Sequence, residues 1–218
     1  YFAGLAHAKS ENEKLRRELR DARAIANANL ANARQAEGLK KLLQFEGGAT
    51  YPKDYRAVNT TVISYPSSSF AQVVTIAAGS HSGIRVNTPV VTADGLIGRV
   101  ANVGPRTSSV TLLTDPDNNV PARDVSRGVS GLIRHGQGST LVFDRVAKEQ
   151  VVKKGDIVVT QGTVDRHFPS VYPYGIAIGR VLSVGRSDIA TFLTVTVTPF
   201  ASFDSLDAVA ALVSTKKR

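Results

Sequence analysis

The sequence changes abruptly in character near residue 46. Before that point it is rich in alanine and charged residues, contains no proline, and has glycine only at positions 4 and 38. After it come all 9 prolines and the remaining 16 of the 18 glycines, scattered among short runs of valine, isoleucine and threonine. Proline and glycine disfavour helix interiors and concentrate in turns. The change therefore predicts a long helix joined to an all-β body, an organisation that favours a protein that organises others over an enzyme.

Charge and length limit the functions open to this chain. The body after residue 46 is long enough for one large core or for two cores of roughly 80 residues each. The net charge is +9, of which residues 1–46 carry +3 (nine Lys/Arg minus six Asp/Glu). A positive surface favours anionic partners such as nucleic acid, phospholipid headgroups or an anionic cell-wall polymer. Because the basic residues are dispersed and form no stripe, the sequence argues against nucleic acid.

Two absences in the composition also constrain the interpretation. Cysteine does not occur, which excludes disulfides, thiol catalysis and cysteine-ligated metal sites. The first residue is Tyr1 and methionine is also absent, so we expect a fragment or a processed product of a longer protein. No apolar run approaches the roughly 20 residues that span a bilayer, and we expect any membrane helix to lie upstream of this fragment.

The N-terminal segment has the spacing of a weak heptad seam. Positions three and four residues apart form one helical face from Ala8 to Leu43, on which polar residues also occur, at Asn12, Asn29 and Lys40. A dimeric coiled coil is favoured, and a single solvated helix lying on the body is the alternative. The predicted dimerisation residues are Leu15, Leu19, Ala22, Ala26, Ala33, Ala36 and Leu43.

Two further features of the helix follow from the same segment. Other registers, through Ile25, Leu30 and Leu39, are nearly as apolar as the favoured seam. Gly47 and Gly48 are expected to end the helix as a C-cap and to act as a hinge before the body.

The body is expected to consist of short strands separated by turns. Runs rich in β-branched residues recur at roughly 8–12-residue spacing, with no helical period between them, a pattern typical of β-barrels or a sandwich. The turns between them contain Asp-Gly, Gly-Pro and Asp-Pro pairs. The expected strands are 57–63, 70–77, 89–93, 96–103, 108–114, 119–123, 129–134, 140–146, 157–160, 176–184 and 192–198.

We therefore predict a mainly β fold in which a coiled-coil helix precedes two small β-barrel subdomains. The expected division is 1–46 for the helix, 47–112 for the first barrel, 113–187 for the second barrel and 214–218 for a basic tail. Residues 188–213 are expected to return and complete the first barrel.

No motif predicts a metal, a cofactor or catalysis. The four histidines lie far apart and lack the spacing of metal ligands. Asp115, Asp117 and Asn119 begin like a calcium loop, but Val120 stands at the sixth position in place of glycine and Ser126 at the twelfth in place of glutamate. A hydrogen-bonded turn is the favoured interpretation.

A two-barrel serine hydrolase, or an inactive relative of one, is the runner-up among functions, because two-barrel proteins can hold a Ser-His-Asp triad. The candidate nucleophile is Ser130 in the run Gly-Val-Ser-Gly, which matches neither GxSxG nor the trypsin-like Gly-Asp-Ser-Gly. A triad would need His81, His135 or His167 to lie close to an aspartate and to Ser130. We predict no catalytic residue, and the serine hydrolase remains the alternative.

An aromatic loop offers a candidate partner-binding surface. Residues 167–175 combine three aromatic residues with two prolines. Aromatic residues on a rigid loop suit protein recognition, although the same rings could close the end of a barrel. The candidate partner-binding residues are Phe168, Tyr172 and Tyr174.

A series of short sequence blocks follows in a fixed order along the body. The blocks are Pro89 to Val91, Gly95 to Val100, Ser109 to Pro116, Gly155 to Gly162, Phe168-Pro169, Gly175-Ile176, Gly179 to Val181 and Val197 to Pro199. In this order and spacing they resemble the MreC family of bacterial rod-shape-determining proteins, and the resemblance covers essentially the whole chain. The blocks Gly-Leu-Ile-Gly-Arg-Val and Leu-Leu-Thr-Asp-Pro are together the most specific. The chain departs from the family in the loop after Phe168-Pro169, which is longer before Gly175-Ile176.

The resemblance implies a fold, a location and partners. Proteins of this family carry a cytoplasmic tail, one membrane helix, a coiled coil and two small β-barrels on the periplasmic side of the inner membrane. They are not enzymes; they form dimers or filaments and hold peptidoglycan synthases of the elongation machinery in place. The implied partners are a second copy, the penicillin-binding protein 2 transpeptidase, its glycosyltransferase, MreD and, indirectly, MreB. A periplasmic adaptor of a transport system is a third reading, although such adaptors usually flank a helical hairpin with the β-body on both sides.

Overall fold

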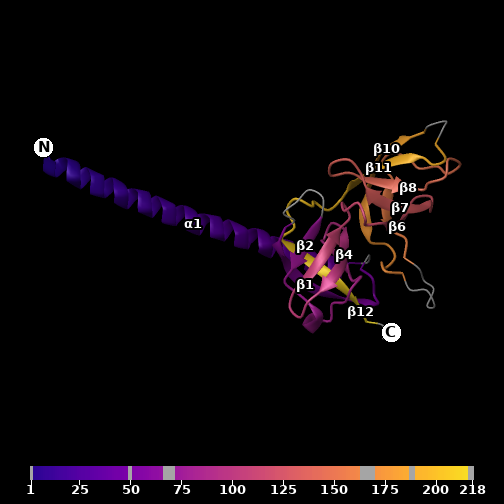
Figure 1. Ribbon diagram of the computed structural model, residues 1–218, viewed down its shortest axis with the longest axis horizontal. Helices are drawn as coiled ribbons and strands as arrows, with labels where there is room; N and C mark the ends of the chain where they lie inside the picture. The colour runs from indigo at the N-terminus through magenta and orange to yellow at the C-terminus, as the bar shows by residue number, and fades with distance from the viewer. Residues whose placement is uncertain (1, 49–50, 66–71, 163–169, 187–189, 216–218) are drawn as a thin grey trace. The chain divides into compact units, whose positions relative to one another are not determined.

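The computed structural model describes residues 2–48, 51–65, 72–162, 170–186 and 190–215. It contains one long helix, α1 (Phe2–Glu46), a short 3-10 helix, η1 (Ser80–Ser82), and a series of short strands (Figure 1). The strands are β1 (Tyr55–Ser64), β2 (Val73–Ile76), β3 (Pro89–Val91), β4 (Leu96–Val103), β5 (Ser108–Leu112), β6 (Val120–Asp124), β7 (Ser130–His135), β8 (Leu141–Asp144), β9 (Ile157–Thr160), β10 (Ala177–Gly185), β11 (Thr194–Pro199) and β12 (Ala208–Ser214).

In this described part of the chain the strands form two closed antiparallel barrels, which confirms the predicted mainly β fold with a leading helix. The strand order is β1-β12-β3-β4-β5-β2 in the first barrel and β10-β11-β8-β7-β6-β9 in the second. Closure of each sheet leaves no unpaired edge along the barrel wall. Alternate strand residues point inward. In β5, for example, Ser108, Val110 and Leu112 are buried, whereas the residues between them are partly exposed.

The first barrel is closed by the last strand of the chain. β12 lies between β1 and β3, with Ala211 opposite both Val58 and Val90. The inward-facing aliphatic side chains form a continuous core that is fully shielded from solvent at Val90, Ile97 and Val110. Burial of such side chains stabilises the fold by about 1.5–3 kcal/mol each.

The second barrel contains a strand that we expected in the first. We expected all of residues 188–213 to complete the first barrel, but β11 pairs with β10 and β8 in the second barrel, and β12 alone joins the first. β10 and β11 are adjacent in sequence, so their pairing closes only a short loop at low entropic cost. Val195 and Val197 on β11 are then fully buried in the core of the second barrel.

The end of helix α1, from Leu39 onward, belongs to the same compact unit as the barrels. Leu42 is 1% exposed and lies in the same core cluster as residues of both barrels. The Phe45 ring meets the Tyr51 ring edge-on at 5.6 Å, and the Asn59 amide donates a 2.6 Å hydrogen bond to the Glu46 carboxylate. The helix ends at Glu46, as expected, and the contacts of Phe45 and Glu46 pack its last turn against the body.

Candidate functional site

The first candidate surface is helix α1. Every side chain from residue 11 to residue 37 is exposed. The predicted seam residues Leu15 and Leu19 are 58% and 51% exposed, and Ile25 and Leu30 of the alternative register are 63% and 53% exposed. The predicted seam alanines lie in the same exposed stretch, and Leu43 is also exposed although it follows the buried Leu42. This segment therefore presents apolar side chains that are exposed in the part of the chain that the structure describes.

The second candidate surface, the aromatic loop, is only partly available. Tyr172 is 3% exposed and packs in the core cluster, so it cannot offer its ring to a partner. Tyr174 is 55% exposed, with the Arg123 guanidinium 5.8 Å from its ring centroid. Phe168 lies outside the described residues. Of the two predicted residues that the structure describes, Tyr174 is the one on the surface.

The position of Tyr172 follows from how the loop is attached to β9. The Thr160 hydroxyl, itself fully buried, donates to the carbonyl of Pro173 at 2.5 Å and accepts from the amide of Ile176 at 2.9 Å. This double hydrogen bond fixes the loop just after Tyr172. Burial raises the pKa of the Tyr172 hydroxyl, and the positive charge of Arg99 opposes that shift.

The residues proposed for a serine hydrolase do not come together. Ser130 and His135 are the first and last residues of the same strand, β7, which at about 3.3 Å per residue places them roughly 17 Å apart. His81 lies in η1 next to the first barrel, and His167 is outside the described residues. Ser130 and His135 therefore cannot belong to one triad, and His81 lies beside the first barrel whereas Ser130 lies on a strand of the second.

The calcium-like run is a hydrogen-bonded turn. The Asp115 carboxylate accepts from the amide of Asp117 at 3.0 Å and from the amide of Gln72 at 3.2 Å. The buried Asn118 side chain donates to the carbonyl of Leu112 at 2.9 Å. The bond to Leu112 ties the connection between the two barrels to β5, and the bond to Gln72 ties it to the residue before β2. Among the described residues, no group of three or more His, Cys, Asp or Glu side chains could hold a metal ion.

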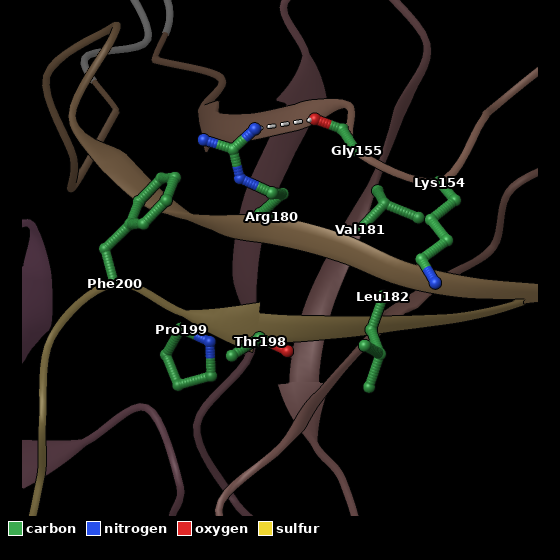
Figure 2. A pocket seen from close by; sticks show the side chains of 8 residues that line it. All are labelled: Lys154, Gly155, Arg180, Val181, Leu182, Thr198, Pro199 and Phe200. Atoms are coloured by element: carbon green, nitrogen blue, oxygen red, sulfur yellow. Dashed lines mark hydrogen bonds between the residues drawn. The ribbon is translucent and has the colours of Figure 1, made fainter.

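The third candidate surface is a groove on the outside of the second barrel, along the β10–β11 hairpin (Figure 2). Its volume is about 370 Å³, and apolar atoms make up most of its lining. Figure 2 shows Phe200 and Arg180 toward one end of the groove and Leu182 and Lys154 toward the other. The lining residues are Lys154, Gly155, Arg180, Val181, Leu182, Thr198, Pro199 and Phe200.

A β-bulge shapes one end of this groove. Val181 pairs with Val197 and Ser183 pairs with Thr196, so Leu182 has no opposite residue on β11. Bulges of this kind redirect side chains and increase local twist. Leu182 is 45% exposed as a result of its outward position.

The loop 153–156 forms the other wall and is held firmly against β10. Gly155 donates its amide to the Val181 carbonyl at 2.9 Å, and Val181 donates to the Asp156 carbonyl at 2.8 Å. The Asp156 carboxylate accepts from the amide of Lys153 at 2.7 Å and from the Arg127 guanidinium at 2.6 Å. These contacts position the exposed Lys154 side chain beside the groove.

Arg180 links the loop to the far end of the groove. It donates to the Gly155 carbonyl at 3.3 Å, as Figure 2 shows, and its guanidinium lies 5.8 Å from the centroid of the Phe200 ring. The guanidinium has five N–H donors, and one of them is used in the hydrogen bond to Gly155. The groove was not predicted from the sequence, although one signal was present: Arg180, Leu182 and Val184 occupy alternate positions of a strand whose outward side is expected to be polar.

The architecture defines a tandem β-barrel protein with a leading helix on which apolar side chains are exposed. The model of the family "Rod shape-determining protein MreC, barrel core" matches residues 62–213. The chain belongs to the MreC family, in agreement with the resemblance seen in the sequence.

Relatives and solved structures support the same assignment. The cell shape-determining protein MreC of Haemophilus influenzae is 30% identical over 198 residues, which cover 90% of this chain and 54% of that protein, so the chain spans about half of that relative's length. A solved structure of MreC is 27% identical, with a TM-score of 0.73 over 84% of this chain and 99% of that one.

A third comparison involves a complex. The structure of a complex between penicillin-binding protein 2 and MreC from Helicobacter pylori matches with a TM-score of 0.56 and 17% identity, over 72% of this chain and 98% of that one. At that identity the likeness shows the fold alone. In the described residues of the present chain, no helix is both long enough and apolar enough to cross a membrane.

Proposed function

We propose that this chain is the barrel-bearing part of a bacterial cell-shape scaffold that dimerises through helix α1 and positions peptidoglycan synthases. In this proposal the chain works by binding and spacing its partners and carries out no chemistry of its own. Linking two barrel pairs in one dimer would raise the local concentration of the enzymes bound to them. Membership of the MreC family supports the role in cell shape.

The exposed apolar residues of α1 are the observation that carries this proposal. Isolated helices are marginal in water even with favourable sequences, and helices in proteins are stabilised mainly by packing of an apolar face. In α1 the side chains of Leu15 and Leu19 are more than half exposed. A second copy of the helix, docked on the seam that runs from Leu15 through Ala22 and Ala36 to Leu43, would cover these side chains, and the small alanines would allow close approach.

The proposed partners follow from the relatives. Because an MreC from Helicobacter pylori forms a complex with penicillin-binding protein 2, we include a transpeptidase of that class among the partners, together with other membrane proteins of the elongation machinery. The proposed location is the periplasmic side of the inner membrane, with the full-length protein anchored by a single upstream helix. On the second barrel, the exposed Tyr174 remains a candidate contact for a partner.

Light scattering on the whole chain tests self-assembly. We expect a dimer or larger species for the native chain and a monomer for the double variant L15N/L19N, because two polar side chains would then be buried at the seam. The matched control is I25N/L30N, which makes the same kind of change at equally exposed positions outside the favoured register. This control should keep the native mass.

Two results would contradict the proposal. A monomeric native chain, at concentrations up to about 100 µM and across ~0.05–0.5 M salt, would leave α1 as a solvated helix without a partner copy. A dimer that is lost in I25N/L30N and kept in L15N/L19N would keep the scaffold but place the seam in the other register.

A further inference from the structure

The groove on the second barrel is lined by apolar side chains that the barrel wall does not need for its own folding. The outward face of a solvated antiparallel strand is normally polar. Here Leu182 is 45% exposed, and Pro199 and Phe200 continue the apolar lining along β11. Exposed apolar surface that is surrounded by polar groups often marks an interaction site.

Two positive charges form that rim. Lys154 and Arg180 are among the residues that line the groove, and none of the lining residues carries a carboxylate. Asp156, two residues after Lys154, binds Arg127 and the Lys153 amide through its carboxylate. Among the residues that the structure describes, no carboxylate forms an ion pair with Lys154 or Arg180, so both cations can face a negative charge supplied from outside.

We propose that this groove binds an extended segment of a partner protein in which a large apolar side chain is next to an Asp or Glu. The apolar side chain lies between Leu182 and Phe200, and acidic side chains next to it face Lys154 at one end of the groove and the remaining N–H donors of Arg180 at the other. Charge-assisted hydrogen bonds from Arg to carboxylate are short and about twice as strong as neutral ones. This inference deepens the proposed scaffold function, on which it rests, by naming the chemistry of a partner.

The shape of the site favours a peptide over a simple anion. The lining follows the hairpin from Phe200 to Leu182, so a ligand must contact apolar atoms along the strands as well as the two cations. A free anion would use Lys154 and Arg180 alone, and exposed charges of this kind give little binding once salt screens them. The apolar contacts thus distinguish a peptide from an ion.

Amide chemical shifts of the isotope-labelled whole chain test the proposal. The probe is the capped peptide acetyl-Leu-Glu-Leu-Glu-Leu-amide, and its neutral match has glutamine in place of glutamate. The acidic peptide is expected to shift the amides of residues 154–155, 180–182 and 198–200, and to bind about tenfold more tightly than the neutral one. Its affinity should also fall as salt rises from ~0.05 to ~0.5 M.

Variants separate the charges from the apolar lining. K154Q/R180Q should remove the preference for the acidic peptide, whereas L182S should weaken both peptides. The matched control K53Q/R106Q removes two exposed positive charges from the first-barrel part of the chain and should bind like the native protein. Equal binding of both peptides, shifts confined to other residues, or no shifts up to ~5 mM peptide would overturn the proposal.

Two further probes identify other occupants. If inorganic phosphate alone shifts the same amides as tightly as the peptide does, the groove is an anion site, and if anionic phospholipid vesicles bind while the peptide does not, it is a lipid site. Either result would overturn the peptide proposal. Light scattering on the native chain keeps this inference distinct from the scaffold itself: a native dimer that fails to bind the peptide rejects only the groove, and a monomeric native chain rejects the scaffold. K154Q/R180Q should keep the native mass.

Discussion

A Cβ atom placed on Gly95 would lie 2.5 Å from the carbonyl oxygen of Ala177. Gly95 directly precedes β4 of the first barrel, and Ala177 begins β10 of the second. The two barrels therefore meet backbone to backbone at this point, with no room for a side chain between them. The glycine that opens the Gly-Leu-Ile-Gly-Arg-Val block is required here by steric contact.

Replacement of this glycine should loosen the junction between the barrels. G95A places a methyl group against backbone atoms, which cannot move as a flexible side chain could, and overpacking of this kind typically costs about 1–3 kcal/mol. Urea unfolding of the whole chain measures the loss. The control is G47A, where an added Cβ would meet its nearest neighbours at an ordinary 3.8 Å. Similar unfolding free energies for native protein and G95A would show that the barrels move apart without penalty.

Leu42 should make the largest contribution among the leucines at the end of helix α1. L42A removes a side chain that is 1% exposed, and substitutions of buried leucine by alanine cost about 2–5 kcal/mol. The matched control L39A changes a residue in the same part of the helix that is 42% exposed, so its cost should stay below about 1 kcal/mol. Thermal or urea unfolding distinguishes the two. Equal losses for both variants would mean that the last turn of α1 is not packed as described.

The Thr160 hydroxyl should be essential for the loop that contains Tyr172. T160V retains the shape of the side chain but leaves the Pro173 carbonyl and the Ile176 amide without their partner. Unsatisfied buried groups cost about 1–3 kcal/mol each, so the unfolding free energy should fall by about 2–4 kcal/mol. T160S restores the hydroxyl and should recover most of that loss. Faster hydrogen exchange at the Ile176 amide in T160V, but not in T160S, would locate the effect; equal exchange would contradict it.

Most of the strands could be predicted, because turn residues mark their ends and alternating apolar residues mark their interiors. The expected strands 96–103 and 157–160 have the bounds that β4 and β9 show. The expected strand 140–146 ends earlier, at Asp144, because Arg145 adopts a left-handed backbone with φ of 60° that interrupts pairing. The pairing partner of β11 could not be predicted, since its apolar pattern fits either barrel.

The binding surfaces were harder to predict because they depend on which side of each strand faces solvent. The apolar spacing of α1 was visible in the sequence, but the burial of Tyr172 was not: it follows from the Thr160 hydrogen bonds, which join residues 13 and 16 positions apart. The groove was missed for a similar reason. Lys154 and Phe200 are distant in sequence, and pairing of β9, β10 and β11 brings them to one place.

Ionisation of Tyr172 should make the protein less stable at alkaline pH. Burial raises the pKa of this hydroxyl, whereas in the unfolded chain it titrates near its ordinary value of about 10. Above about pH 10 the folded state therefore binds more protons than the unfolded state, and stability falls as pH rises, by up to about 1.4 kcal/mol per pH unit for this group. Below that pH the contribution is fully present.

Y172F isolates this effect because phenylalanine has no proton to lose. The Tyr172 hydroxyl donates to the Asn118 side chain at 3.5 Å, the limit for a hydrogen bond, so Y172F should change the unfolding free energy by less than about 1 kcal/mol at pH 7. Urea unfolding at intervals from pH 7 to 11 should give parallel curves for native protein and Y172F up to about pH 9.5. Above that pH the native protein should lose stability faster. Curves that remain parallel to pH 11 would show that the Tyr172 ring is accessible to water in the folded protein, contrary to its burial in the core cluster.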